Sequence, residues 1–427
     1  MPNGESSSRL YRPKLISALA EGYDWRQFRA DAASGLTVAI LALPLSMAIA
    51  VASGVSPERG LYSAIIGGFI VSAMGGSRFQ IGGPAGAFIV LVSITGARFG
   101  LEGLILAVLL SGVMLCLAGA LRIGSLVRHV PHVVTVGFTA GIAAIILVSQ
   151  ISDLLGLEHL ANEPAELVPK LVGLASHIRD ANLIALLIGA GVIATVMVLK
   201  RLYPAAPGML FAIVAATLAI QGLHLPAETV MARFGELPHG LPAPRLDLPS
   251  LDLLVAVLPS ALAFTVLGAI ESLLSAKVAD RMTGRVHRSN MELVAQGVAN
   301  LGAGLFGGLP VTGTIARTAA NIRAGARTPV SGILHSAYLL LFLVAAAPLA
   351  GLIPLAALAG VLVVVAINMV EWSDLRTLLR NWRAAFVLLA TFGFTIRVDL
   401  MAGIVAGCLL SFLLAPRGLG SRSPSPD

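Results

Sequence analysis

The stretch GGLPVTGTIARTAANIRAGARTP, from Gly307 to Pro329, constrains the fold more than any other part of the chain. It combines helix breakers, hydroxyl groups and an arginine, yet it lies between two apolar segments. Backbone polar groups must be paired in hydrocarbon, so a broken segment at membrane depth is either buried in protein or lines a cavity. Transporters use such broken helices as binding sites. A cytoplasmic loop followed by an ordinary helix is the simpler alternative.

The composition favours the membrane setting. Of the 427 residues, 57% are hydrophobic and only 12% are charged, whereas a soluble domain is typically about 25% charged. The sequence therefore predicts an all-α polytopic protein of the cytoplasmic membrane. Cys116 and Cys408 lie in apolar runs without partner spacing, which predicts neither a disulfide nor a metal site.

Apolar segments that could cross a bilayer, about 20 residues each, recur along the whole chain. Together with two shorter segments and a weaker one they predict about fourteen spans, arranged as two blocks of about seven. The segments begin near Ala32, Gly60, Pro84, Glu102, Val133, Ala181, Ala206, Leu251, Glu292, Thr312, Pro329, Pro354, Arg383 and Leu400.

The basic residues set the predicted orientation. With the N-terminus inside, the inward segments carry about three times as many Lys and Arg residues as the outward ones, which is the asymmetry that the positive-inside rule requires. Both termini are then cytoplasmic. The predicted parts are an N-terminal segment (1–30), which has no apolar core and is not a signal peptide, a first repeat (31–223), an extracytoplasmic connection (224–250), a second repeat (251–415) and a disordered tail (416–427).

The two blocks share one sequence feature. RFQIGGPAGAFIVLV in the first block and LFGGLPVTGTIARTAAN in the second both open a short apolar segment with Gly-Gly followed by Pro. Paired segments of this kind at corresponding positions indicate an inverted-repeat binding site. An odd number of spans per block requires the second block to be inverted. The sequence therefore predicts a 7+7 inverted repeat whose two half-helices meet at the midplane, N-terminus to N-terminus.

Two facing helix N-termini bring together free backbone N–H groups and the positive ends of two dipoles, and this combination attracts an anion. Pro44 kinks the first span and lets Leu45 and Ile49 face the site. Phe88 forms an apolar wall, or is simply a core residue. The predicted anion contacts are the amides of Ala85, Gly86 and Ala87, the amides of Gly313, Thr314, Ile315 and Ala316, the hydroxyls of Thr312 and Thr314, and the guanidinium of Arg317.

Each of the two intramembrane charged residues has two possible interpretations. Charges in a bilayer are costly and are usually kept for binding, coupling or pairing. Arg317 either supplies binding-site charge or pairs with a carboxylate or helix carbonyls and only holds the fold. Glu271, well inside its span, either carries a proton or cation or forms a structural ion pair. We predict that Glu271 and Ser275, one turn later, form the coupling site.

Other chemistry finds no support in the sequence. No nucleophile elbow, Walker loop or HExxH motif lies in a fitting context, so no enzyme activity is predicted. The basic residues lie between spans and not on one hydrophilic face, which argues against nucleic acid. We expect no cofactor beyond a coupling proton or Na⁺. The histidines are scattered without ligand spacing, and we interpret them as loop and interface residues: His129, His132, His287 and His335.

Long motifs carry a family resemblance. LGAIESLLSAKVADRMTG, and then HRSNMELVAQGVANLGAGLFGGLPVTGTIARTAANIRAGARTPVSGILHS, resemble the second half of the sulfate permease (SulP) family of anion transporters. ALPLSMAIAVASGV, ERGLYSAIIGG and GGSRFQIGGPAGAFIV resemble its first half. The resemblance extends from about Trp25 to Leu414 and implies a uracil-permease-like fold in which a core domain moves against a gate domain like an elevator. It places the anion near Leu45, Ile49, Phe88 and Thr314 to Arg317, and the coupling carboxylate at Glu271.

The chain also departs from the family pattern. Many members continue into a cytoplasmic STAS domain, and this sequence stops at Asp427 without one. Leu45 and Ala316 stand where animal members often have Gln and Ser. The sequence around IESLL and TIARTAAN most resembles that of the bacterial aerobic C4-dicarboxylate members, with bicarbonate and sulfate members next.

We therefore predict proton-coupled symport of a small dicarboxylate such as fumarate or succinate. The alternatives are a proton- or sodium-coupled sulfate or bicarbonate transporter, an uncoupled anion channel or exchanger, and a nucleobase permease on the same fold. Arg317 argues against the last, since a neutral base needs hydrogen-bonding amides and an acid. Homodimer formation stays open.

Overall fold

The computed structural model describes residues 11–125, 131–157, 167–203, 207–245, 250–398 and 400–414. The predicted tail at 416–427 and His129 lie outside these ranges. The first half of the chain forms α2 (Lys14–Ala20), α3 (Trp25–Ala52), α4 (Pro57–Tyr62), η1 (Ser63–Gly67), α5 (Gly68–Met74), β1 (Gly82–Gly83), η2 (Gly86–Phe88), α6 (Ile89–Ala120), η3 (Ile123–Ser125), α7 (His132–Ser149), α8 (Ile151–Leu155), α9 (Leu167–Ser176), η5 (Ile178–Asp180), α10 (Leu183–Leu202), α11 (Gly208–Leu223) and α12 (Val230–Phe234).

The second half repeats the pattern of long helices interrupted by one short strand. It forms α13 (Leu251–Thr283), α14 (Ser289–Leu305), β2 (Thr312–Gly313), α15 (Ile315–Arg323), α16 (Val330–Gly351), α17 (Leu355–Met369), α18 (Trp372–Leu379), α19 (Trp382–Arg397) and α20 (Leu400–Leu414). Helices coincide with the predicted apolar segments in both halves, so the prediction of an all-α polytopic fold is confirmed.

Among the described residues, six helices are individually long and apolar enough to cross a membrane, or seven if α17 and α18 count as one bent span. The other predicted segments are shorter or broken. α6 shows why, because Gly100 has φ 67° and ψ −173° inside it. A glycine reaches that conformation without strain. The break divides α6 into the short segment predicted from Pro84 and the span predicted from Glu102.

Local capping sets several helix boundaries. Asp24 accepts a hydrogen bond from the backbone N of Gln27 at 2.7 Å and starts α3, while Ser250 accepts one from Leu253 N at 3.2 Å and starts α13. α13 ends at Thr283 and is followed by Gly284, whose φ of 68° is the left-handed conformation typical of a helix end. Short-range chemistry therefore sets the start of both helices and the end of α13.

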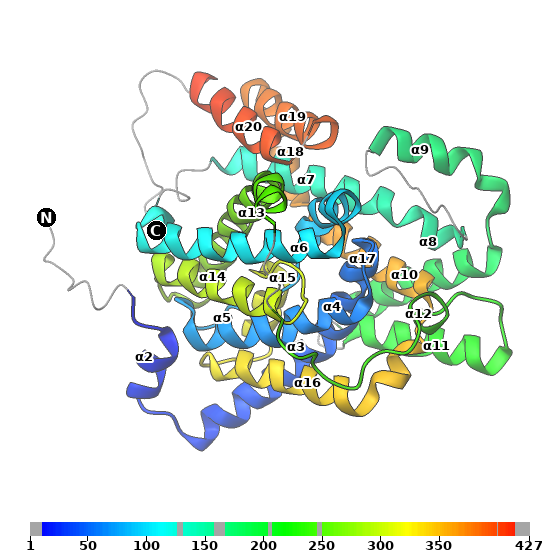
Figure 1. Ribbon diagram of the computed structural model, residues 1–427, viewed down its shortest axis with the longest axis horizontal. Coiled ribbons are helices and arrows are strands. Elements are labelled where there is room, and N and C mark those ends of the chain that lie inside the picture. The colour runs from blue at the N-terminus through cyan, green and yellow to red at the C-terminus, as the bar shows by residue number, and fades with distance from the viewer. Residues whose placement is uncertain are drawn as a thin grey trace, which may run out of the picture. The chain divides into compact units, whose positions relative to one another are not determined.

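Contacts divide the chain into two compact units, one formed by Met1–Arg128 with Ile146–Ala366 and the other by His129–Ile145 with Ile367–Asp427. In the larger unit, helices of the two halves pack on each other: α6 lies against α13 and α14, and α16 lies against α3 and α5 (Figure 1). Glycines allow the closest of these approaches. A Cβ on Gly112 of α6 would lie 2.8 Å from the carbonyl oxygen of Gly297 on α14.

A buried carboxylate fastens α3 to the segment that follows α15. Asp31 is fully buried and accepts hydrogen bonds from the backbone N of Arg327 at 2.7 Å and of Thr328 at 3.1 Å. The Thr328 hydroxyl donates a third at 2.6 Å, and the Tyr23 hydroxyl a fourth at 3.2 Å. A buried charge is tolerated when it is fully hydrogen-bonded in this way, so Asp31 links the two halves of the chain structurally.

Candidate anion site

The two Gly-Gly and Pro segments meet in the larger unit. β1 and β2 form an antiparallel two-stranded pair in which Gly82 faces Gly313 and Gly83 faces Thr312. The backbone N of Thr314 extends the pair with a hydrogen bond to Ile81 O at 3.2 Å. η2 and α6 follow β1, and α15 follows β2. The predicted meeting of two inverted half-helices is therefore confirmed, and backbone pairing holds it together.

Both half-helices begin without a side-chain cap. Ala85 precedes η2 and Thr314 precedes α15, and neither makes a capping hydrogen bond within the part of the chain that the structure describes. The first N–H groups of a helix have no partner inside the helix. An anion between the two starts can accept hydrogen bonds from these groups and is favoured by both dipoles.

Arg317 reaches from the second half-helix to the start of the first. It lies in the first turn of α15, is 2% exposed, and its Nη2 donates a hydrogen bond to the carbonyl oxygen of Pro84. Within the described ranges, its Nε and Nη1 have no hydrogen-bond partner, nor does the hydroxyl of Thr314. A Cβ on Gly83 would collide with Nη1. Arg317 thus makes the structural carbonyl contact and still keeps donors free for a ligand.

Most of the other predicted contact residues are buried. Leu45 and Ile49 are buried on α3, which packs against α15. Phe88 is buried in edge-to-face contact with Phe264 of α13, with ring centroids 5.8 Å apart. The residues whose amides or hydroxyls were predicted to contact the anion differ in exposure. Ala85, Ala87, Thr312, Gly313 and Thr314 are buried, Gly86 is half-buried, and Ile315 and Ala316 are exposed.

Three residues of α13 at helical spacing hold β2 and α15. The hydroxyls of Ser272 and Thr312 are 2.7 Å apart, and Thr312 also donates to Gly268 O at 3.2 Å. Ser275 donates to the Thr318 hydroxyl at 3.2 Å. The sequence pattern suggested Ser275 for coupling and did not point to Ser272; the structure shows both in hydrogen bonds that position the second half-helix.

Glu271 lies on α13 between these anchors. It is half-buried, and its Oε2 has no hydrogen-bond partner among the described residues. The charges of Glu271 and Arg317 interact electrostatically, but in the same part of the chain no direct ion pair joins them. The alternative of a structural contact ion pair is thus not what the structure contains. A carboxylate with a free oxygen close to a cation can take up a proton or cation when the charge balance changes.

α14 supports both strands through residues that the sequence motifs did not single out. Glu292 is fully buried and accepts hydrogen bonds from Gly76 N at 2.8 Å and Ser77 N at 3.0 Å, in the loop that leads to β1. Two turns later, Asn300 bonds both backbone groups of Val311, which precedes β2. The spacing of Glu292, Gln296 and Asn300 is the signal that could have found them, since it places three polar side chains on one face of an apolar helix.

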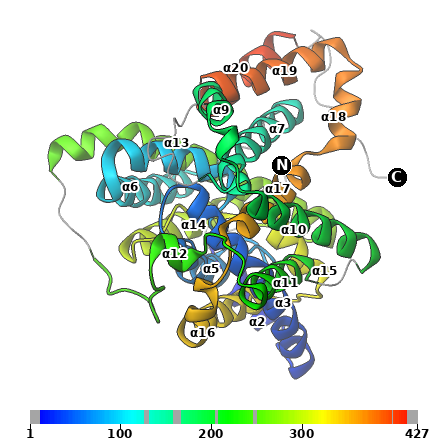
Figure 2. The same ribbon diagram turned by 90° about the vertical axis from the view of Figure 1, so that its right-hand side faces the viewer.

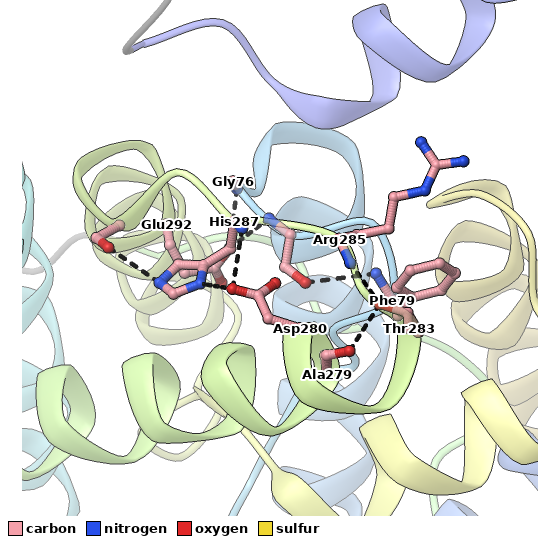
Figure 3. A network of polar contacts seen from close by, with 10 residues as sticks. Gly76, Phe79, Ala279, Asp280, Thr283, Arg285, His287 and Glu292 are labelled. Carbon is pink, nitrogen blue, oxygen red and sulfur yellow. Dashed lines mark hydrogen bonds and ion pairs between the residues drawn. The ribbon is translucent and has the colours of Figure 1, made fainter. Parts of the chain in front are cut away.

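The turn between α13 and α14 reinforces the same loop. Figure 3 shows the imidazole of His287 against the carboxylate of Asp280, with Nδ1 and Oδ2 2.6 Å apart. The Ser289 hydroxyl lies 2.9 Å from the other ring nitrogen, Nε2. The backbone N of Arg288 donates to Gly76 O at 2.9 Å. His287 therefore lies in a loop, as the sequence predicted, and contacts Asp280 and Ser289.

Other histidines differ in their surroundings. His335 on α16 is fully buried, and neither ring nitrogen has a partner among the described residues. In the smaller unit, Nε2 of His132 is 2.7 Å from Oδ2 of Asp374, and Glu371 offers a third ligand atom within 4.8 Å. These three residues are exposed or half-exposed, and the His–Asp contact already accounts for two of them. No metal role follows from this group alone.

Comparison with known proteins gives consistent matches over nearly the whole chain. The model of the sulfate permease family matches residues 28–391. The putative sulfate transporter YvdB of Bacillus subtilis is 42% identical over 410 residues, which cover 96% of this chain and 77% of that protein.

Solved structures match the fold. The transmembrane domain of a cyanobacterial bicarbonate transporter, BicA, superposes with a TM-score of 0.81 at 32% identity, covering 89% of this chain and 98% of that one. The murine Slc26a9 anion transporter in its inward-facing state gives a TM-score of 0.86 over 97% of this chain and 72% of that one. Its identity is 18%, so this likeness concerns the fold alone.

Proposed function

The chain belongs to the sulfate permease family of anion transporters, and on that basis we propose that it is a secondary active transporter of a small inorganic oxyanion, either sulfate or bicarbonate. The sequence motifs alone favoured a C4-dicarboxylate as the substrate. The matched proteins are named for sulfate and bicarbonate, and they support the alternative better. Sulfate comes first because the relative with 42% identity carries that name.

One observation carries the anion site. The Nε and Nη1 groups of Arg317 have no partner among the described residues, at the point where two uncapped half-helices begin. Guanidinium groups bind oxyanions through paired, charge-assisted hydrogen bonds. Backbone N–H groups at helix starts add donors without adding side-chain bulk. The site therefore suits a compact anion with several oxygens.

The proposed transport step moves this site as a whole. The strand pair, α13, α14 and Arg317 join the two half-helices by hydrogen bonds, so both ends of the site belong to one packed body. We propose that this body carries the anion in an elevator-like movement. Glu271 would couple the movement to a proton or Na⁺, because its charge interacts with Arg317 without a direct ion pair among the described residues.

Uptake into proteoliposomes tests the function. Radiolabelled sulfate, bicarbonate and fumarate are each supplied with an inward proton gradient, an inward sodium gradient or no gradient, and protein-free liposomes are the control. We expect one of the two inorganic anions to accumulate above equilibrium under one gradient only. Accumulation of fumarate alone would show that the substrate is a dicarboxylate and not an inorganic anion. Equilibration of every anion under every gradient would show that the protein is an uncoupled channel or exchanger.

The orientation is a separate proposal. The excess of Lys and Arg in the predicted inward segments supports a cytoplasmic membrane location with both termini inside. Single cysteines introduced near the N-terminus and in the 224–250 connection, probed with a membrane-impermeant thiol reagent on intact cells, test it. Labelling of the cysteine near the N-terminus, but not of the cysteine in the connection, would show that the orientation is the reverse of the proposed one.

A further inference from the structure

The corner between α18 and α19 differs from the other helix connections of the smaller unit. α18 has no buried residue. Figure 2 shows it as a short helix set at an angle to α19, with α20 beyond. Trp372 at its start is 51% exposed, and Trp382 at the start of α19 is 69% exposed. Exposed tryptophans at the ends of apolar segments are typical of the interface between a bilayer and water.

Three exposed arginines gather at this corner. Arg376 and Arg380 lie one helical turn apart, and Arg383 follows in the first turn of α19. Among the residues that the structure describes, no carboxylate forms an ion pair with any of them. Like charges one turn apart destabilise a helix. A bound anion would remove that cost, and the described part of the protein does not supply one.

A shallow depression that is open to the surroundings lies beside two of these arginines. It measures about 400 Å³ and is lined by Arg380, Asn381, Trp382 and Arg383. The guanidinium of Arg383 lies over the ring of Trp382, 5.4 Å from its centroid, which orients it. The side chain of Asn381 accepts a hydrogen bond from the backbone N of Arg383 at 3.1 Å and caps α19. The depression thus combines two cations with the positive end of a sixteen-residue helix.

We propose that this corner binds the phosphate headgroup of an anionic phospholipid in the leaflet that it faces. A phosphate is the common chemistry of a lipid headgroup and of a free phosphate ion, and Arg380 and Arg383 suit either. The apolar surroundings favour the lipid. Leu379 and Phe386 flank the residues of the depression and are 45% and 53% exposed, so acyl chains can cover them while the headgroup lies in the depression.

The proposal gives α18 a function. The short helix α18 contains Arg376 together with Trp372, Leu375 and Leu379 and is followed by Arg380, so it can lie in the membrane interface. A headgroup between α18 and α19 would fix the angle between the two helices. The smaller unit would then be anchored to anionic lipid, independently of which anion the larger unit transports.

The test uses the full chain in nanodiscs. Native mass spectrometry counts phosphatidylglycerol molecules retained on release from nanodiscs of phosphatidylcholine mixed with phosphatidylglycerol. Arg383→Gln is compared with Arg98→Gln, a matched control because Arg98 is also exposed and also lies over an aromatic ring, that of Phe99 at 5.0 Å. Near an anionic surface one arginine changes lipid affinity about fivefold. We expect Arg383→Gln to lower phosphatidylglycerol retention by about that factor and Arg98→Gln to leave it unchanged.

Two further arms make the result decisive. Arg383→Lys keeps the charge and should restore much of the retention, which separates binding from misfolding. In nanodiscs of phosphatidylcholine alone, inorganic phosphate should shift the melting temperature equally in the parent and in Arg383→Gln, whereas added phosphatidylglycerol should raise that of the parent more. Equal retention in the parent, Arg383→Gln and Arg98→Gln would overturn the proposal. Stabilisation by inorganic phosphate that Arg383→Gln abolishes, without any effect of phosphatidylglycerol, would also overturn it and would identify a soluble anion site at the corner.

Discussion

Asn300 pairs with both backbone groups of Val311: its Nδ2 donates to Val311 O and its Oδ1 accepts from Val311 N, each at 2.9 Å. A side-chain amide therefore completes the backbone pairing that the chain cannot complete for itself just before β2. Eight residues earlier on the same face of α14, Glu292 accepts hydrogen bonds from two backbone N–H groups of the loop before β1. One helix thereby sets the distance between the two strands on which the candidate anion site is built.

Removing the amide should loosen this arrangement. Asn300→Ala leaves two buried backbone groups unpaired, each costing about 1–3 kcal/mol, so we expect a loss of about 2 kcal/mol or more in stability and weaker anion binding. Thermal unfolding in detergent and an equilibrium binding titration measure the two effects. Gln221→Ala, at an exposed position of α11, is the control. Parent-like stability in Asn300→Ala would contradict the supporting role of Asn300.

A methyl group at Gly83 should disturb Arg317. The new Cβ would collide with Nη1, so Gly83→Ala must displace the guanidinium from its place beside the strand. We expect anion affinity to fall at least about tenfold, which corresponds to about 1.4 kcal/mol. Gly235→Ala is the control, because Gly235 also has a positive φ (79°) and no atom lies within 4 Å of its Cβ. If both variants bind the anion like the parent, Nη1 does not contribute to the site.

Replacing Arg317 separates its two roles. Arg317→Ala removes charge-assisted hydrogen bonds of about 1.5–3 kcal/mol each, and we expect the anion dissociation constant to rise more than about tenfold. Arg317→Lys should recover part of the affinity, because it keeps the charge and loses the paired donors. The dissociation constant and the melting temperature are measured together. An unchanged dissociation constant in a less stable Arg317→Ala protein would leave Arg317 with a structural role only.

Neutralising Glu271 should uncouple transport from its driving ion. Glu271→Gln keeps the shape of the side chain but cannot change its charge, so we expect gradient-driven accumulation to disappear while anion exchange persists. Counterflow and net uptake into the same proteoliposomes distinguish these activities. Glu102→Gln on the exposed side of α6 serves as the control. Full accumulation by Glu271→Gln would remove Glu271 from the coupling mechanism.

A pH dependence is expected at the N-terminal segment. The Arg78 guanidinium donates a hydrogen bond to Glu21 and lowers the pKa of that carboxyl below its ordinary value of 4.5. A lowered folded-state pKa contributes stability that is present above about pH 4.5 and is lost as the pH falls through the folded-state pKa.

Because Glu21 is half-exposed, the contribution should be below about 1 kcal/mol. Glu21→Gln should therefore be slightly less stable than the parent at pH 7, and the difference should vanish in acid. Melting temperatures of both proteins across the acid range check this. Glu236→Gln, exposed and without an ion pair among the described residues, should show no such trend. A difference that is constant with pH would contradict the assignment.

The sequence predicted the parts of the fold that local chemistry determines. Gly and Pro at the openings of two short apolar segments are local signals, and they correctly indicated the half-helices that β1 and β2 now join. The break at Gly100 likewise coincides with a predicted boundary between segments. Arg317 was predicted at the site from its own position, because a charge at membrane depth is costly and is usually kept for binding or pairing.

The partners of these residues could not be predicted in the same way. Glu292 bonds Gly76 from 216 positions away, and Ser272 bonds Thr312 across 40. Such pairs depend on how the helices pack, which the order of residues in one chain does not reveal. The relation of Glu271 to Arg317 is similar: the sequence left both an ion pair and a free carboxylate open, and only the packed arrangement separates the two groups.

The pairing of Gly82 with Gly313 also limits how the chain can be divided. Each strand finds its hydrogen-bonding partner in the other half, and Arg317 completes its own contact at Pro84, 233 positions away. A polypeptide cut in the 224–250 connection would therefore leave two fragments, each with an unpaired strand and half of the candidate anion site. Neither fragment could bind anion by itself, but the two produced together could reassemble it, so a gene split at that point should work only by complementation.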